Sequence, residues 1–311
     1  MPLVFLILII VFGSLLLLFI LFFIINGAIF TKLSFRRRIG DKDFAENEDK
    51  SAKEAPDRMW FFSSKIEEIN LVSRDKLNFK GYFISNNSNK LAILVHGYHG
   101  RYYSVVSQAR IFNELGYDVL CINDRCHDTS EGKYFTMGTF ERIDTLEWIQ
   151  LMLKRNPNYQ IVLYGISMGG HIALQTSALK NLPQEVKCVI SDCGYCSLKK
   201  QLVEATKQSP ALFPTMVVNL AEVYSRLFYH FNYSNSLDKT LKNVKIPICL
   251  IHGTEDKYVR TQNMDEIYDS IPDGIHKEKH YFEGSRHTRS VVDNPKKYRE
   301  IVKEFTDKFV K

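Results

Sequence analysis

The segment that decides the fold runs from Ile161 to Leu174 and reads IVLYGISMGGHIAL. Its first half is a short apolar run typical of a buried strand, and its second half continues as a helix-like segment. Ser167 lies at the junction, with Gly165 and Gly169 two residues away on either side. Such a corner forces the serine into a strained backbone, and the glycines leave room for the strand and the helix to approach closely. Gly-x-Ser-x-Gly therefore predicts an exposed nucleophile, although by itself it also fits an ordinary glycine-rich turn.

Other short apolar runs follow Trp60, and longer amphipathic segments separate them. Two alternating runs come first, EINLVSR (68–74) and LNFKGYFIS (77–85), and are followed by LAILVHG (91–97), GYDVLCIND (116–124), QIVLYG (160–165), VKCVISD (186–192) and IPICLIHG (246–253). Helical spacing is clearest in TFERIDTLEWIQLMLK (139–154). Continuous apolar strands that alternate with helices predict an α/β fold, with a mostly parallel sheet covered by helices on both faces.

One interval interrupts the alternation. More than fifty residues separate VKCVISD from IPICLIHG, and they include the apolar and aromatic stretch PALFPTMVVNLAEVYSRLFYHF (210–231). This interval is too long for a simple crossover between strands. We expect a helical cap insertion at about 197–243, within a domain that covers 60–311.

The N-terminus is different in character. Residues 3–30 carry no charge and are long enough to cross a hydrocarbon layer of about 30 Å as a helix. A signal peptide would have a basic region, a shorter apolar core and a small-residue cleavage site, and we see none of these. We therefore expect a transmembrane anchor at 1–30 and a polar juxtamembrane linker at 31–59. Basic residues lie only after the apolar segment, which predicts a single-pass cell-membrane protein with its domain in the cytoplasm: Lys32, Arg36, Arg37, Arg38 and Lys42.

The net charge of +6 comes from basic residues that are spread along the chain. Nucleic-acid binding would require basic side chains clustered on one face with aromatic residues between them. The folded part has no such cluster, so we do not expect a nucleic-acid partner.

Two further residues make the serine corner chemically informative. A serine hydroxyl needs a base to take its proton, and a carboxylate to orient that base. Asp256 follows the strand IPICLIHG, with Glu255 as a less favoured neighbour, and His287 follows the next strand-like run, KEKHYFEG (277–284). The order Ser167, Asp256, His287 is the one expected for a parallel sheet with a nucleophile corner. Two other histidines lie before or within the strand rather than after it: His276 and His280.

A pair of backbone amides completes the predicted machinery. The turn after LAILVHG can present the N–H of Tyr98, and the amide of Met168 follows the nucleophile directly. Together they predict an oxyanion hole. His96 and His99 lie in the same turn, but without a carboxylate or a third histidine at ligand spacing a structural role is favoured over a metal site. We expect neither a metal nor a cofactor.

Six cysteines lie mainly on or beside the predicted buried strands, which suits small apolar residues in a reducing compartment: Cys121, Cys126, Cys188, Cys193, Cys196 and Cys249. Cys193 and Cys196 form a C-x-x-C pair. The pair lacks a thioredoxin-like context and a second pair, so redox chemistry or zinc binding is a minority interpretation.

Six segments in this order resemble the α/β-hydrolase superfamily, most of all bacterial membrane-anchored serine hydrolases of the uncharacterised-esterase or serine-aminopeptidase-like type: ILVHGYHG, DRCHDTSEGKYFTMG, LYGISMGG, ISDCGY, IHGTEDKYV and GSRHTRS. The resemblance covers about 60–311. It implies Ser167 as nucleophile, Asp256 and His287 as its partners, and the Tyr98 and Met168 amides as the oxyanion hole. The chain departs from the family where Cys126 and Asp128 replace two glycines, which puts the conformation of that loop in question.

These observations predict a serine hydrolase that cleaves an ester, thioester or amide through an acyl-enzyme. The apolar cap and the anchor favour a carboxylesterase acting on hydrophobic or lipid-derived acyl substrates. A peptidase acting on short peptides would use the same residues. A catalytically idle binding protein on a hydrolase scaffold and a thiol oxidoreductase are the alternatives from other classes.

Overall fold

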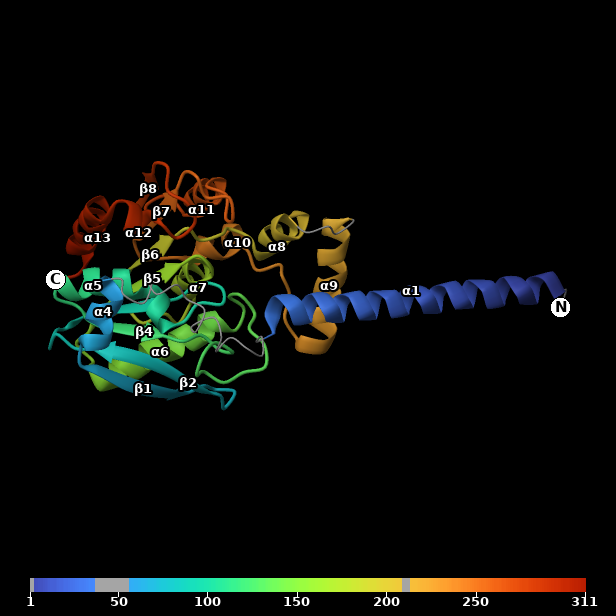
Figure 1. The fold of residues 1–311 in the computed structure, drawn as a ribbon, viewed down its shortest axis with the longest axis horizontal. Helices are drawn as coiled ribbons and strands as arrows, with labels where there is room; N and C mark the ends of the chain where they lie inside the picture. Colours follow the sequence, from blue (N-terminus) through green and yellow to red (C-terminus); the bar gives the residue numbers. More distant parts are fainter. Residues whose placement is uncertain (1–2, 37–55, 209–212) are drawn as a thin grey trace. The chain divides into compact units, whose positions relative to one another are not determined.

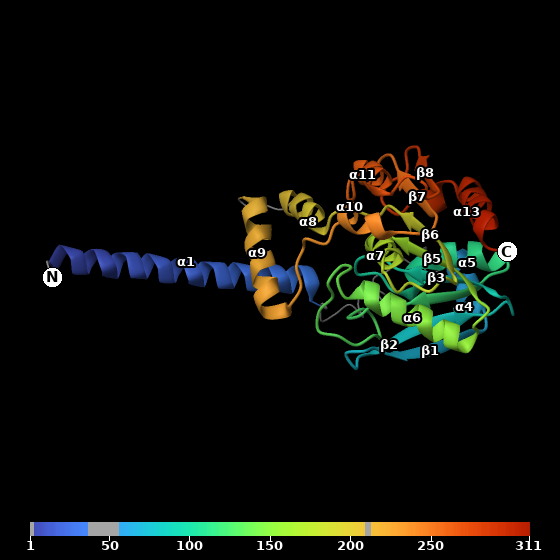
Figure 2. The same ribbon diagram turned by 180° about the vertical axis from the view of Figure 1, so that it is seen from behind.

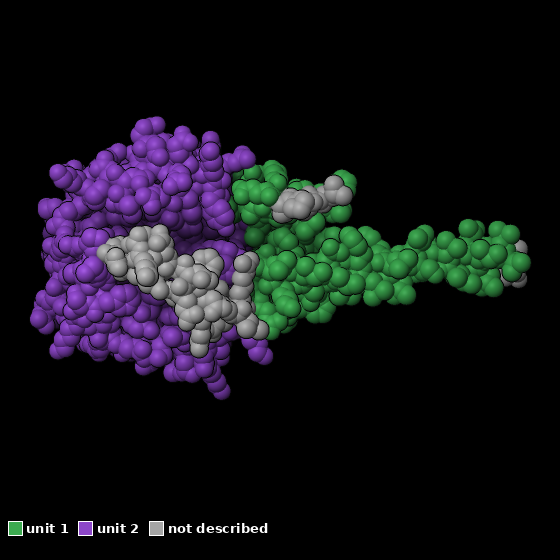
Figure 3. Space-filling view, viewed as in Figure 1, with its two compact units in different colours: residues 1–36, 199–234 green, residues 37–198, 235–311 purple. Residues whose placement is uncertain are grey.

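The computed structural model describes residues 3–36, 56–208 and 213–311. The chain divides into unit 1, residues 1–36 and 199–234, and unit 2, residues 37–198 and 235–311 (Figure 3). Unit 2 contains the sheet and the predicted site residues. Unit 1 contains the long N-terminal helix and part of the expected cap insertion.

Unit 2 is built on a sheet of eight strands in the order β1-β2-β4-β3-β5-β6-β7-β8 (Figure 1). The first two pairings, β1 with β2 and β2 with β4, are antiparallel, and all the others are parallel. The strands are β1 (Ile66–Val72), β2 (Asn78–Ile84), β3 (Lys90–Val95), β4 (Asp118–Ile122), β5 (Gln160–Ile166), β6 (Val186–Asp192), β7 (Ile248–Gly253) and β8 (Lys277–Phe282). The mostly parallel sheet expected from the alternating sequence is confirmed.

Helices cover the two faces of this sheet. On one face, alternate strand residues form a continuous apolar core with α4 (Pro56–Ser63), α5 (Val106–Glu114), α12 (Ser290–Asp293) and α13 (Pro295–Phe309). On the other, α7 (Met168–Ser177) packs on β5 and β6 and is flanked by α6 (Glu141–Arg155) (Figure 2). The shorter elements of this unit are η1 (Tyr102–Val105), α10 (Leu237–Thr240), η2 (Leu241–Asn243) and α11 (Gln262–Ser270). The central strands have helices on both faces, so neither face contacts water. This is why their sequences are unbroken apolar runs.

Unit 1 consists of α1 (Leu3–Phe35), α8 (Leu198–Lys207, from its second residue) and α9 (Pro214–Tyr229). Among the described residues, α1 is the one helix that is long and apolar enough to cross a membrane, a property that anchors and signal sequences share. It continues to Phe35, five residues into the segment expected to be the linker, where Thr31 and Phe35 are buried against the rest of the unit. Residues 37–55 of the expected linker lie outside the described residues. The position of the cap insertion over the sheet stays a prediction.

Candidate active site

The corner between β5 and α7 contains a single residue, Ser167. Its backbone has φ +56° and ψ −116°, a conformation that residues other than glycine rarely adopt. A Cβ atom on Gly165 would collide with the carbonyl oxygen of Gly169, and one on Gly169 would collide with the carbonyl oxygen of Val95. The glycines are therefore required by the close approach of α7 to β5 and β3, as the sequence predicted.

Three side chains that are distant in the sequence converge at this corner. Ser167 Oγ lies 2.9 Å from His287 Nε2, and His287 Nδ1 lies 2.6 Å from Asp256 Oδ2. The residues follow β5, β8 and β7, so all three lie beyond the carboxyl ends of parallel strands, where open α/β sheets bind ligands. The structure thus brings together the three residues that the sequence singled out, while Glu255 beside them is exposed. Their catalytic roles remain a prediction.

The environment of Asp256 keeps its carboxylate charged. The N–H groups of Tyr258 and Val259 each donate to Oδ1 at 2.9 Å. Burial alone would raise the pKa of Asp256, but hydrogen bonds from His252 and His287, together with the backbone amide, hold it well below its usual range. A permanently ionised carboxylate is suited to orienting the ring of His287 and to stabilising its positive charge.

His252 is a second histidine next to this carboxylate, and the sequence analysis missed it. Its Nε2 atom is 3.2 Å from Asp256 Oδ2 and 2.8 Å from the carbonyl oxygen of Val259, so one N–H is shared between two acceptors. The side chain is almost fully buried at the end of β7. The available signal was a histidine inside the apolar run IPICLIHG, four residues before the aspartate.

Cys193, the other neighbour of this group, lies directly after β6 with φ +44°. Its sulfur and one ligand atom each from Asp256 and His287 lie within 4.8 Å of one another, the spacing of a possible metal group. Burial raises the pKa of the Cys193 thiol well above its usual range, so the sulfur is protonated and is a poor nucleophile. His287 and Asp256 are already hydrogen-bonded to each other. This geometry gives little support to the redox and metal interpretations of the C-x-x-C pair.

The turn that follows β3 lies against the serine. A Cβ atom built on Gly97 would be 3.3 Å from Ser167 Cβ and 3.8 Å from its Oγ, so Tyr98 follows a residue in contact with Ser167. His96 Nδ1 is 2.8 Å from the carbonyl oxygen of Gly97, and His96 Nε2 accepts a hydrogen bond from the amide of Asp124 at 3.1 Å. Burial lowers the pKa of His96 to about 3, so its ring is neutral. His96 thus holds the turn in which the Tyr98 amide is the predicted oxyanion donor.

Two residues of the loop that departs from the family adopt backbone angles that glycine adopts most easily. Cys126 has φ +65° and Asp128 has φ +45°, both in the left-handed region. The amide of Cys126 donates to the carbonyl oxygen of Glu131 at 2.9 Å, and Asp128 lies 3.4 Å from the guanidinium of Arg101. These contacts offset the strain of about 1–2 kcal/mol that a side chain brings to each position. Contacts within the loop and with Arg101 thus hold both residues in this backbone conformation.

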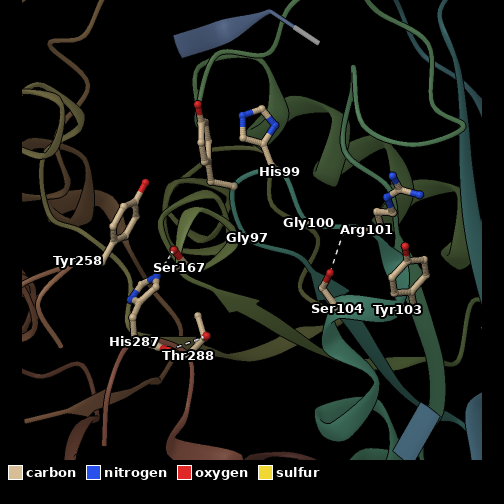
Figure 4. Close-up of a pocket in the computed structure, with 11 residues that line it drawn as sticks. Gly97, His99, Gly100, Arg101, Tyr103, Ser104, Ser167, Tyr258, His287 and Thr288 are labelled. Carbon is tan, nitrogen blue, oxygen red and sulfur yellow. Dashed lines mark hydrogen bonds between the residues drawn. The ribbon is translucent and has the colours of Figure 1, made fainter. Parts of the chain in front are cut away.

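A cavity of about 500 Å³ opens directly beside Ser167 and His287 (Figure 4). Its walls include the turn after β3, Arg101, and Tyr258, whose ring is 5.1 Å from the ring of His287. The described lining residues are Gly97, Tyr98, His99, Gly100, Arg101, Tyr103, Ser104, Ser167, Tyr258, His287 and Thr288. The volume is within the range of small-molecule sites. Ser167 and His287 thus face a space large enough for a small molecule.

Comparison with known sequences identifies a family. The family model described as "Serine aminopeptidase, S33" matches residues 86–241, half of the chain. These residues include the serine corner and the predicted oxyanion turn. The uncharacterized protein YqkD of Bacillus subtilis (strain 168) is 24% identical over 235 residues, which are 74% of this chain and 75% of that protein.

Solved structures show the same fold. The esterase Pf2001 of Pyrococcus furiosus has a TM-score of 0.67 and 22% identity, covering 79% of this chain and 93% of that one. Mouse alpha/beta hydrolase domain-containing protein 10 has a TM-score of 0.57 and 15% identity, covering 78% of this chain and 99% of that one. At these identities the likeness establishes the fold, and it confirms the α/β-hydrolase fold expected from the sequence.

Proposed function

This chain belongs to the serine aminopeptidase S33 family of α/β hydrolases, and we propose that it cleaves carboxylic esters through an acyl-enzyme formed on Ser167. The observation that carries the proposal is the continuous hydrogen-bonded path beside the cavity. It runs from Asp256 Oδ2 to His287 Nδ1 over 2.6 Å and from His287 Nε2 to Ser167 Oγ over 2.9 Å.

The path accounts for every proton in the reaction. His287 Nε2 takes the proton of Ser167 as Oγ attacks the substrate carbonyl, and the Nδ1–H donates to the charged Asp256. The negative oxygen that forms is bound by the amides of Tyr98 and Met168, the second of which is at the N-terminus of α7. His287 then protonates the leaving group. The same ring then takes a proton from water as the water attacks the acyl group, and returns that proton to Ser167 Oγ as the acid leaves.

The walls of the cavity favour a substrate with an apolar acyl group. Tyr98, Tyr103 and Tyr258 supply aromatic surface for an apolar acyl group. We therefore propose a hydrophobic or lipid-derived acyl ester as substrate. The family description keeps short peptides as the second candidate.

Labelling with a fluorophosphonate probe tests the nucleophile. The full-length protein should become labelled, Ser167→Ala should not, and Asp256→Asn should react more slowly by a factor of about 10⁴ because the ring then adopts the wrong tautomer. An unlabelled but folded wild-type protein would favour a binding protein with idle catalysis. Turnover of p-nitrophenyl esters of graded chain length, compared with aminoacyl anilides, separates the esterase from the peptidase.

We further propose that α1 anchors the chain in the cell membrane with unit 2 in the cytoplasm. The support is the length and apolar composition of α1 together with the basic residues that follow it in the sequence. Protease added to intact cells should leave unit 2 undigested. Digestion of unit 2 from outside would show that the orientation is the opposite one.

A further inference from the structure

Helix α9 of unit 1 lies across α1. The two ribbon views agree on this crossing (Figure 1 and Figure 2). The two helices are in close contact. A Cβ atom added to Gly27 would lie 2.6 Å from Tyr224 Cβ, and Thr31 Oγ1 is 3.2 Å from Ser225 Oγ. The ring of Phe35 also packs 5.2 Å from another ring of the unit, that of Phe231. The crossing therefore fixes α9 to α1 at residues 27–31.

The free part of α1 has the length of a bilayer core. Residues 3–22 are all exposed, and Phe23 is the first residue that the rest of unit 1 partly covers. Twenty residues of helix rise about 30 Å, which is the thickness of the hydrocarbon layer. Gly27 lies roughly 7 Å further along the helix axis. If residues 3–22 cross the hydrocarbon, α9 lies at the depth of the lipid headgroups.

The surface of α9 is divided into three stripes. Its buried stripe faces the rest of the unit: Val218, Ala221, Glu222 and Ser225. Its exposed side carries an apolar stripe that begins at the N-cap: Phe213, Met216, Val223, Leu227 and Phe228. Beside it runs an exposed polar stripe: Thr215, Asn219 and Arg226. Phe213 is 69% exposed and Leu227 is 62% exposed, so both side chains present apolar surface to their surroundings.

We propose that α9 is an interfacial helix whose apolar stripe lies in the surface of the membrane that α1 spans. The inference rests on the proposed anchoring role of α1. An exposed apolar stripe next to a polar one is the pattern of helices that lie flat at the boundary of headgroups and acyl chains. The occupant is lipid because α9 is fixed at the end of the segment that matches the hydrocarbon layer. The side chains of Lys32, Arg36 and Arg226 lie near the same end of α1 or on α9 and can reach phosphate groups.

A depth measurement tests the proposal in the full-length protein. Leu227→Cys on the apolar stripe and Asn219→Cys on the polar stripe are each labelled with the fluorophore NBD. The six native cysteines are all buried and react slowly in the folded protein. The chains are reconstituted in phosphatidylcholine–phosphatidylglycerol vesicles with and without doxyl-labelled lipids. We expect a blue shift and strong doxyl quenching at position 227, and weak quenching at position 219.

Every outcome decides the proposal. Equal, weak quenching at both positions would overturn the proposal. A blue shift at position 227 that depends on protein concentration, without quenching by doxyl lipid, would also overturn it, because a second copy of the chain would then cover the apolar stripe. Release of the protein from the vesicles by alkaline carbonate would show that α1 does not span the membrane. It would overturn both the anchoring role of α1 and the interfacial role of α9. Hydrolysis of a p-nitrophenyl ester is measured on the same samples. Its absence with lipid quenching intact would reject the esterase while leaving the membrane surface in place.

Discussion

Replacing Ser167 with glycine should abolish activity and yet give a more stable protein than replacing it with alanine. The φ of +56° and ψ of −116° at this residue are accessible to glycine, whereas such a conformation costs another residue about 1–3 kcal/mol. Glycine loses more backbone freedom on folding, which costs about 0.5–1 kcal/mol relative to alanine. The difference should favour Ser167→Gly over Ser167→Ala by roughly 0.5–2 kcal/mol.

Alanine is the matched comparison because both variants lose the Oγ contact with His287. Thermal unfolding of the two full-length variants in one detergent measures the difference. A domain of this size shifts its Tm by about 2–4 °C per kcal/mol, so the glycine variant should melt roughly 1–8 °C higher than the alanine variant. An equal or lower Tm for Ser167→Gly would refute the argument that the nucleophile corner is strained.

Three further predictions concern the residues around the corner. Gly169→Ala should unfold the domain or lower its stability by more than about 3 kcal/mol, because its Cβ would lie 2.2 Å from the carbonyl oxygen of Val95. Gly170→Ala should be milder, because its Cβ would lie 2.6 Å from the movable Ser191 hydroxyl and no closer than 3.2 Å to a backbone oxygen; comparable urea midpoints would contradict this. Burial lowers the pKa of His171 from 6.5 to about 4, so stability from its neutral ring is present above pH 6.5 and lost as pH falls toward 4. The unfolding free energy of wild type relative to His171→Gln should therefore fall by about 1.4 kcal/mol per pH unit in that window, and a constant difference would argue against it. His252→Phe removes a shared hydrogen bond to the charged Asp256, worth about 1.5 kcal/mol, and should lower kcat roughly tenfold with little change in KM, with partial recovery in His252→Gln; wild-type kcat in the phenylalanine variant would exclude this positioning role.

The order of elements and the main side chains of the site were accessible from the sequence because each depends on local patterns. A strand buried on both faces reads as an apolar run, and a residue just past such a run lies at the carboxyl edge of the sheet. These two rules place Ser167, Asp256 and His287 on one edge without coordinates. The structure adds the distances that make the prediction specific.

What the sequence did not reveal depends on contacts between distant segments. His252 looked like part of a strand, and only the path of the following loop brings its ring to the aspartate. The positive φ of Cys126 could not be predicted from its residue type, which disfavours that conformation, because it depends on a hydrogen bond across the loop to Glu131. The continuation of α1 to Phe35 likewise depends on packing within unit 1.

The most direct test of the account is to identify the atom that becomes acylated. Full-length protein is mixed with a p-nitrophenyl ester, quenched in acid within the first turnovers, digested, and analysed by mass spectrometry. We predict the mass of one acyl group on the peptide that contains Ser167, and its absence in Ser167→Ala. Acylation of Cys193, or ester turnover without any adduct on the serine, would contradict the account.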